Sequence, residues 1–474
     1  MSKQPLEFFK ELTRIPRETG DEKAVSDYIL EFARRRGLEA VQDEVYNVIV
    51  YKPGTSGYEQ APAVVLQGHL DMVYIKGESS PHDYNSPLEL IEEADMLRAN
   101  DTSLGADNGI GCAYALALLD STDLPHPPLE ALFTTGEEVG MVGVETLDPA
   151  RIHGRRLINL DSEGENGFTV GCAGGVRISV RLDAGRTDPP AGYAAWALNI
   201  HELRGGHSGL EIDKGRGNAN RLLGRTLLAV SRKTALRVGA LSGGSKTNAI
   251  PDRAEAVLLV PEKDAASLQA AVAGCQEDFR AELGASDPDV TLSLSPAQAG
   301  QVLSEKAAQG IVTLLCAIPT GVQSMSMYLP GLVECSNNIG TLVCEDGAVH
   351  IHCAVRSSVS SLKHAVCDQI ELIATAAGAS TERASAYPAW PYAPQSPLRD
   401  LCTAVYREIY GREPEVGAIH AGLECGYFIE MWPDMDVISM GPNISGAHTP
   451  QETLDLASCR RMWQLLLRLL AAMK

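Results

Sequence analysis

The apolar positions of the first 165 residues alternate between the periods that mark strands and helices. Val25, Ile29 and Phe32 recur at helical spacing and predict a helix that stops before Gly37. A second predicted helix, rich in small residues, covers 110–119. Short β-rich or continuously apolar runs predict strands at 45–51, 64–73, 129–135 and 156–160. This alternation predicts an α/β domain with a central mixed sheet flanked by helices.

These segments end in polar side chains. The endings are His69 with Asp71, Asp107 in the turn 105–109, Glu137 with Glu138, and Asp161 with Glu163. Each ending alone has an ordinary structural explanation, such as a helix cap, a turn or a solvated surface. Ligands of open α/β sheets gather outside the carboxyl ends of the strands. Four such endings in succession therefore predict one shared polar site.

The pattern changes near residue 186, where Asp188-Pro-Pro-Ala-Gly is typical of a linker. The residues up to 388 carry no comparable clusters of strand-end carboxylates. His207 lies in a glycine-rich stretch, for which a surface loop is the ordinary interpretation. The segments that begin at Asn248 and Asn338 both lead into strands and then a helix. They predict two related α+β halves of one inserted domain.

The first pattern resumes at Trp390-Pro-Tyr-Ala-Pro. Helices are predicted over 398–410 and 454–473, and strands over 416–420 and 437–440. His448 follows the last strand in a loop, where it could supply a further ligand. We therefore expect a discontinuous domain formed by 1–186 and 389–474, with 187–388 inserted as a separate domain.

Composition narrows the class of protein. The 474 residues are 45% hydrophobic, enough for two or more domains with sizeable cores. A net charge of −21 argues against binding to nucleic acid or an anionic membrane and suits small-molecule substrates. No signal peptide and no apolar run of membrane-spanning length is visible. The 11 cysteines include no Cys-x-x-Cys pair, so we expect reduced thiols in a cytoplasmic protein.

Several short sequence motifs, taken in chain order, resemble those of a known protein family. Their spacing alone does not reveal this resemblance. They are Gly-His-Leu-Asp, Gly-Ala-Asp-Asn-Gly, Glu-Glu, Asn-Leu-Asp-Ser-Glu, Gly-Gly-His-Ser-Gly, Ile-His-Ala-Gly-Leu-Glu-Cys-Gly and Gly-Ala-His-Thr-Pro-Gln-Glu. Together they resemble the dinuclear zinc metallopeptidase family of aminoacylases and carnosinases. The resemblance runs essentially from end to end.

The resemblance implies two Zn²⁺ ions per chain, with Mn²⁺ or Co²⁺ able to substitute. The implied ligands of one ion are His69, Asp107 and Asp161. The implied ligands of the other are Asp107, Glu138 and His448, so that Asp107 bridges both ions. All of these residues are present at the matching positions.

Two further residues have implied catalytic roles. Asp71 would orient His69, and Glu137 would act as the general base while a hydroxide shared by the two ions attacks the peptide carbonyl. The resemblance also implies a cis peptide bond between Asp107 and Asn108.

The implied activity is hydrolysis of dipeptides, including Xaa-His substrates, in the cytoplasm. The inserted domain would act as a lid, with His207 donating to the oxyanion. Asn248, Arg356 and Gly422 would contact substrate, and a cation such as Arg356 suits a free carboxylate. From strand alternation alone Arg356 would be a surface residue. Whether the chain forms a homodimer stays open.

Two alternatives remain at this point. An amidohydrolase that acts on N-acyl amino acids would share the same metal centre, and substrate profiling separates it from a dipeptidase. A non-catalytic metal-binding protein would have lost residues needed only for turnover. Because Glu137 and His207 are both present, the sequence favours an enzyme.

Overall fold

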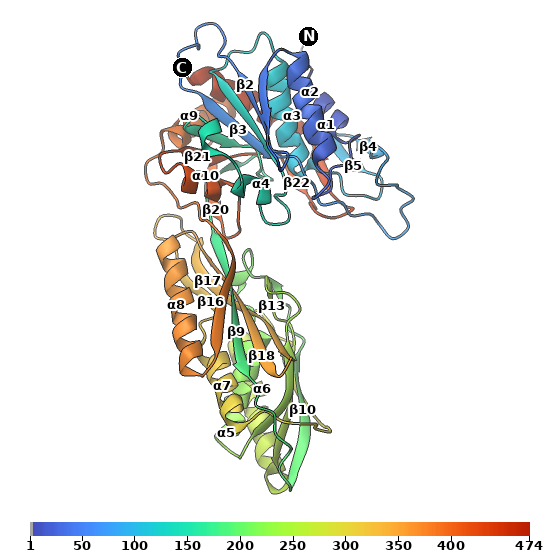
Figure 1. The fold of residues 1–474 in the computed structure, drawn as a ribbon, viewed down its shortest axis with the longest axis vertical. Helices are drawn as coiled ribbons and strands as arrows, with labels where there is room; N and C mark the ends of the chain where they lie inside the picture. The colour runs from blue at the N-terminus through green and yellow to red at the C-terminus, as the bar shows by residue number, and fades with distance from the viewer. Residues whose placement is uncertain (1–2) are drawn as a thin grey trace. The chain divides into compact units, whose positions relative to one another are not determined.

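The computed structural model describes residues 3–474, which form two compact units (Figure 1). The first unit comprises the described chain up to Gly171, Tyr392–Ala418 and Leu423–Lys474. The second comprises Cys172–Pro391 and Ile419–Gly422. The first crossing lies earlier than residue 186, because β9 (Gly174–Asp183) pairs with strands of the second unit.

The first unit is built around an eight-stranded mixed sheet. Its strands, in spatial order, are β1 (Glu39–Gln42), β2 (Val48–Lys52), β6 (Leu129–Thr134), β3 (Val64–His69), β7 (Arg156–Asn159), β21 (Asp436–Ser439), β8 (Gly167–Cys172) and β20 (Glu415–Ile419). All six residues of β3 are buried, as expected for a central strand whose two faces are covered. Strands β6, β3, β7 and β21 run parallel, so their carboxyl ends share one edge.

Helices flank this sheet and a smaller sheet accompanies it. The helices are α1 (Pro5–Leu12), α2 (Lys23–Arg35), α3 (Ala106–Asp120), α4 (Val142–Glu145), α9 (Pro397–Tyr410), α10 (Cys425–Met431) and α11 (Leu456–Ala472). The four-stranded sheet contains β22 (Ile444–Ser445), β23 (Thr453–Asp455), β5 (Met96–Ala99) and β4 (Leu90–Glu93), in that order. Helix α3 is buried on all sides and packs on β3, as its apolar composition requires. The predicted mixed α/β fold is confirmed.

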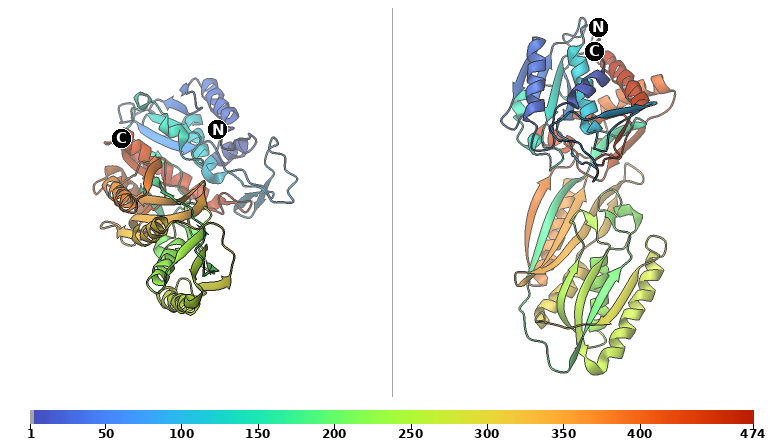
Figure 2. Two further views of the ribbon diagram at one scale, coloured as in Figure 1. Left: turned by 60° about the horizontal axis from the view of Figure 1, so that its bottom comes forward. Right: turned by 90° about the vertical axis from the view of Figure 1, so that its right-hand side faces the viewer.

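The second unit has one large antiparallel sheet covered by helices. Along the sheet lie β15 (Thr291–Pro296), β10 (Tyr193–His201), β14 (Ala254–Pro261), β12 (Arg237–Gly243), β17 (Val333–Glu345), β18 (Ala348–Ser357), β9 and β19 (Ser380–Tyr387), and β16 (Gly321–Met325) pairs with β17. A separate ribbon joins β11 (Gly206–His207) to β13 (Ala249–Ile250). Figures 1 and 2 show α5 (Ala219–Ser231), α6 (Ala265–Leu283), α7 (Glu305–Ala317) and α8 (Ser360–Ala376) along one face of the sheet. Alternate residues of β9 are buried beneath that helical layer.

Two predicted element boundaries are wrong. Asn338 does not precede a strand but lies inside β17, where its side-chain amide donates to the carbonyls of Thr247 and Ala249. The closing helix was expected from residue 454, yet Thr453–Asp455 form β23 and the helix starts at Leu456. Asp455 caps that helix by accepting a hydrogen bond from the Ser458 amide.

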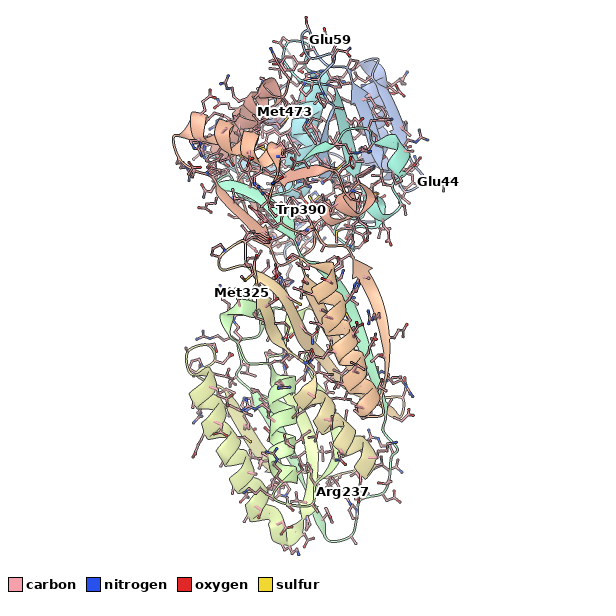
Figure 3. The ribbon with its side chains drawn as sticks, turned by 90° about the vertical axis from the view of Figure 1, so that its left-hand side faces the viewer. Glu44, Glu59, Arg237, Met325, Trp390 and Met473 are labelled. Carbon is pink, nitrogen blue, oxygen red and sulfur yellow. The ribbon has the colours of Figure 1, made fainter. Side chains whose placement is uncertain are left out.

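The chain enters and leaves the second unit through a short backbone pairing. The amide of Cys172 donates to the Trp390 carbonyl at 2.9 Å, and the Trp390 amide donates back at 3.1 Å. Trp390, labelled in Figure 3, is 3% exposed. Over residues 3–474, no helix combines the length and the apolar character needed to cross a bilayer.

Small residues let the start of α3 approach the ends of β3 and β7. Asn108 donates from Nδ2 to the Leu160 carbonyl at 2.7 Å. A Cβ on Gly68 would lie 2.3 Å from Asn108 Oδ1, and one on Gly111 would lie 2.5 Å from the Leu160 oxygen. Only glycine fits at these two positions. The Asp107–Asn108 peptide bond is cis, as the resemblance implied.

Two buried charged residues fix the loop that leads into α3. The Glu452 carboxylate accepts hydrogen bonds from the backbone amides of residues 104–107, at 2.7 to 3.3 Å. Arg17 donates to the carbonyls of Leu70, Asp71 and Gly105. Because Glu452 lies four residues after His448, it ties the His448 loop to the segment that carries Asp107.

We predict that Glu452→Gln lowers the free energy of unfolding by about 2–4 kcal/mol. In the wild type both carboxylate oxygens accept from backbone amides, whereas the NH₂ group of glutamine would face two of these amides as a second donor. Denaturant unfolding measures this change. Glu430→Gln, at an exposed position on α10, is the matched control and should stay within about 0.5 kcal/mol. Equal stability of both variants would show that the Glu452 carboxylate does not hold this loop.

Candidate metal centre

The carboxyl ends of neighbouring strands in the first unit carry most of the predicted site residues. His69 ends β3, the Glu137–Glu138 pair follows β6, and Asp161 follows β7. Strand β21, beside β7, leads into the loop with His448. Because these strands are parallel, their endings meet at one edge, as expected for a site on an open α/β sheet.

His69 is fixed from behind and faces two carboxylates. Its Nδ1 lies 3.1 Å from the Asp71 carbonyl oxygen and 3.4 Å from Asp71 Oδ1. Its Nε2 lies 3.0 Å from Asp107 Oδ1 and 3.4 Å from Asp161 Oδ1. A proton on Nδ1 satisfies Asp71 and leaves Nε2 free to act as a ligand. Sequence reasoning expected this orienting role of Asp71.

Asp107 faces a different histidine with each of its oxygens. Oδ1 points to His69, and Oδ2 lies 3.2 Å from His448 Nε2. His448 Nε2 is also 2.9 Å from Glu138 Oε1, a buried atom that makes no hydrogen bond of good geometry. Asp107 thus presents one carboxylate oxygen to each of two histidines. Ligand atoms of His69, Asp107 and Glu138 lie within 4.8 Å of one another.

The donor set fits binding of divalent metal. The structure gathers all five predicted ligands: His69, Asp107, Glu138, Asp161 and His448. Imidazole nitrogens and carboxylate oxygens without a thiolate suit Zn²⁺, Mn²⁺ or Co²⁺. Glu138 Oε1 has only the His448 ring nitrogen beside it and no hydrogen bond of good geometry, so a cation would satisfy it.

The electrostatics of the centre also call for a cation. Burial opposes protonation of His69, but Asp161 and Asp107 raise its pKa well above the usual value. Close contacts with the carboxylates of Asp107 and Glu138 raise the pKa of His448 to about 10. The carboxylates around the two rings thus favour positive charge at both, as a bound proton or as a cation. Metal binding would displace these protons, as it does wherever histidine ligands must be neutral.

Glu137 precedes the predicted ligand Glu138 in sequence but is not itself a predicted ligand. Its backbone amide donates to Asp71 Oδ1, and that of Glu138 donates to Asp71 Oδ2, both at 3.2 Å. Asp71 thus contacts both the turn that carries Glu137 and the ring of His69. Burial raises the pKa of the Glu137 carboxyl well above its usual value, and nearby negative charges add to this rise. Such a group is able to accept and retain a proton.

The four predicted substrate contacts, His207, Asn248, Arg356 and Gly422, belong to the second unit. His207 Nδ1 accepts hydrogen bonds from the amides of Gly209 (3.3 Å) and Leu210 (3.0 Å). These bonds place the His207 proton on Nε2, which is then a donor. His207 pairs with Ala249, next to the exposed Asn248. Gly422 lies in the segment Ile419–Gly422.

Arg356 stands in a row across the sheet of the second unit. It lies opposite Ser336 on β17 and opposite Gly175 on β9. Arg356 Nη1 donates to the Tyr387 hydroxyl at 2.7 Å, and Tyr387 lies over Gly175, where a Cβ would come within 2.4 Å of its ring. Arg356 Nε is buried and has no hydrogen-bond partner among the described residues.

His420 borders the same row. Its Nε2 and the Ser336 hydroxyl are 2.7 Å apart. Burial lowers the pKa of His420 to about 4, and the charge of Arg356 adds to this effect. His420 is therefore neutral at physiological pH and leaves Arg356 as the positive charge of the row.

Sequence reasoning missed several residues that support the site. Glu424 and His420 lie inside a phrase that carries the resemblance, and Glu452 closes another, but spacing gave none of them a role. Tyr387 and Arg17 lie outside all of these phrases. Their partners are distant in sequence, so only the fold reveals them.

Known proteins resemble the chain along its whole length. It is 38% identical over 473 residues to a cytosol non-specific dipeptidase of Escherichia coli, covering 99% of this chain and 98% of that one. The crystal structure of an aminoacylhistidine dipeptidase from Vibrio alginolyticus has a TM-score of 0.94 at 37% identity, covering 99% and 96% of the two chains. A tripeptidase from Staphylococcus aureus, at 16% identity, TM-score 0.57 and coverage of 100% and 99%, shares the fold.

The model of peptidase family M20/M25/M40 matches residues 65–472, which include every predicted metal ligand. Together with the identity along the full length, this match shows that the chain belongs to peptidase family M20/M25/M40.

Proposed function

We propose that this protein is a cytoplasmic dipeptidase that hydrolyses short peptides with a pair of metal ions. The observation that carries the proposal is the Asp107 carboxylate, whose two oxygens face His69 and His448 separately. Family membership implies a metal cofactor. The Escherichia coli relative named as a cytosol non-specific dipeptidase supports the activity, the compartment and a broad substrate range. The similar structure named as an aminoacylhistidine dipeptidase supports Xaa-His dipeptides among the substrates.

The two ions would be Zn²⁺, with Mn²⁺ or Co²⁺ able to replace it. His69, Asp107 and Asp161 would hold one ion, and Asp107, Glu138 and His448 the other. When bound, such ions act as Lewis acids that polarise the peptide carbonyl and lower the pKa of water.

The side chains of the first unit would handle the proton. Glu137 takes a proton from the attacking water and returns it to the nitrogen of the leaving amine. Asp71 keeps the His69 ring in the orientation and tautomer that a ligand needs. The hydrogen bond from the Glu137 amide to Asp71, which anchors the turn that carries Glu137, supports this role.

We assign the second unit, Cys172–Pro391 with Ile419–Gly422, the role of the lid expected over 187–388, and the first unit the role of the catalytic domain. His207 would donate its Nε2 proton to the developing oxyanion, and Asn248 and Gly422 would contact the substrate backbone. Arg356 would bind the free carboxylate of the dipeptide, because it is a cation that is only partly buried. Recognition of both ends limits the substrate to two residues.

A substrate panel tests the proposal. The metal-loaded protein should hydrolyse simple dipeptides and Xaa-His dipeptides faster than tripeptides or N-acetyl amino acids, measured as kcat/KM. Faster hydrolysis of N-acetyl amino acids would instead identify an acylamino-acid hydrolase with the same centre.

Replacing the proposed base tests the proton transfer. Glu137→Gln should retain both ions while kcat falls by about 10²–10⁴, the range for losing a general base. Metal analysis and steady-state kinetics measure the two effects, and Glu145→Gln on α4 is an exposed control. Loss of an ion, or turnover close to wild type, would remove Glu137 from this role.

Replacing Arg356 tests recognition of the carboxylate. Arg356→Ala should weaken kcat/KM for a dipeptide by about 2–5 kcal/mol, the range for removing one partner of a buried charge pair. The loss should be much smaller for the matching dipeptide amide, which lacks the carboxylate. Arg181→Ala, on the solvent-exposed face of β9, should change neither value. Equal losses on both substrates would show that Arg356 is structural.

A further inference from the structure

Buried polar residues lie just inside the strand ends that carry the proposed ligands. Gln67 precedes His69 by two residues, and Asn159 precedes Asp161 by two. Thr134 ends β6 and Ser439 ends β21. All four are fully buried. Buried polar side chains in a central sheet require partners, and these residues find them in one another.

Hydrogen bonds join these residues in the order of the strands. The Ser439 hydroxyl donates to Asn159 Oδ1. Asn159 Nδ2 donates to Gln67 Oε1 at 2.5 Å, and Gln67 Nε2 lies 3.0 Å from Thr134 Oγ1. The series crosses β21, β7, β3 and β6, which are neighbours in the sheet. We call Ser439, Asn159, Gln67 and Thr134 the transverse chain.

Glu424 terminates the transverse chain. Its Oε2 accepts hydrogen bonds from Gln67 Nε2 at 2.6 Å and from Thr134 Oγ1 at 2.8 Å. The side chain is 1% exposed, and Oε1 is buried without a hydrogen-bond partner in the described chain. Burying a carboxylate is costly, and only one of the two Glu424 oxygens accepts hydrogen bonds. That oxygen lies where the bonds from Gln67 on β3 and Thr134 on β6 converge.

We propose that Gln67 and Glu424 are positioning residues, and that the transverse chain sets the lateral spacing of the strand ends that carry His69 and Asp161. The inference rests on the proposed metal pair. Amide side chains bonded at both ends fix the distance between neighbouring strands. Partners that orient metal ligands typically contribute 10–100-fold to metal affinity.

Variants that break the chain at unchanged volume test the proposal. Gln67→Met and Glu424→Leu remove its hydrogen bonds, and Thr134→Val removes them at one end with little change of shape. Glu424→Gln is the conservative rescue, because its carboxamide oxygen accepts the same two bonds. Val65→Ala, a buried position on the same strand β3, is the control for loss of stability without loss of the chain.

The readouts are the zinc dissociation constant from chelator competition, the thermal midpoint of the metal-free protein, and kcat and KM. Gln67→Met and Glu424→Leu should weaken zinc binding 10–100-fold, Thr134→Val several-fold, and Glu424→Gln by less than about threefold. The kcat should fall more than KM rises, because misplaced ions still allow substrate binding. Val65→Ala should lower the midpoint and leave zinc affinity unchanged.

Three results would overturn the proposal. One is unchanged zinc affinity in Gln67→Met and Thr134→Val. Another is a loss in Val65→Ala as large as theirs, which would make the effect one of stability. The third is a Glu424→Gln loss equal to that of Glu424→Leu, which would make the charge necessary and the hydrogen bonds dispensable. If wild type itself binds no pair of ions, the proposed function fails instead.

Discussion

The shared carboxylate of Asp107 is the constraint on which the rest of the first unit depends. Its oxygens face His69 and His448, residues from opposite ends of the chain. Asp107 can occupy this place because Gly68 and Gly111 let the start of α3 approach β3 and β7. Glu452 then ties the Asp107 segment to the His448 loop through four backbone amides. A discontinuous domain is what brings both histidines to one strand edge.

Charge explains why so much of the surrounding structure is polar. Burial and neighbouring carboxylates raise the pKa of Asp161 to about 8, and burial raises that of Glu424 to about 7. A group of buried acids is unfavourable unless cations or hydrogen bonds compensate it. Asp71, Glu452 and the transverse chain supply hydrogen bonds, and two divalent ions would supply the charge. In the second unit, a separate positive charge lies on Arg356, whose Nη1 donates to the Tyr387 hydroxyl.

The apolar pattern predicts that several strand ends meet at one polar site, and the motifs that carry the family resemblance supply the individual proposed ligands. His69, Asp107, Glu138, Asp161 and His448 each occupy a short motif, and the structure gathers all five. The supporting residues could not be predicted in the same way. Gln67 and Glu424 are 357 positions apart, and no local period links them. The same holds for Arg356 and Tyr387, which are hydrogen-bonded across the sheet. It also holds for Asn338, which lies inside β17 and donates to the carbonyls of Thr247 and Ala249.

The central claim is that a bound metal pair performs the hydrolysis, and metal removal with stepwise return tests it most directly. Zinc content and dipeptide hydrolysis would be measured together as chelated protein is titrated with Zn²⁺. The account predicts two ions per chain, no hydrolysis without metal, and recovery that tracks occupancy. Full hydrolysis by the metal-free protein would contradict the account, and so would a recovery of hydrolysis that does not follow zinc content.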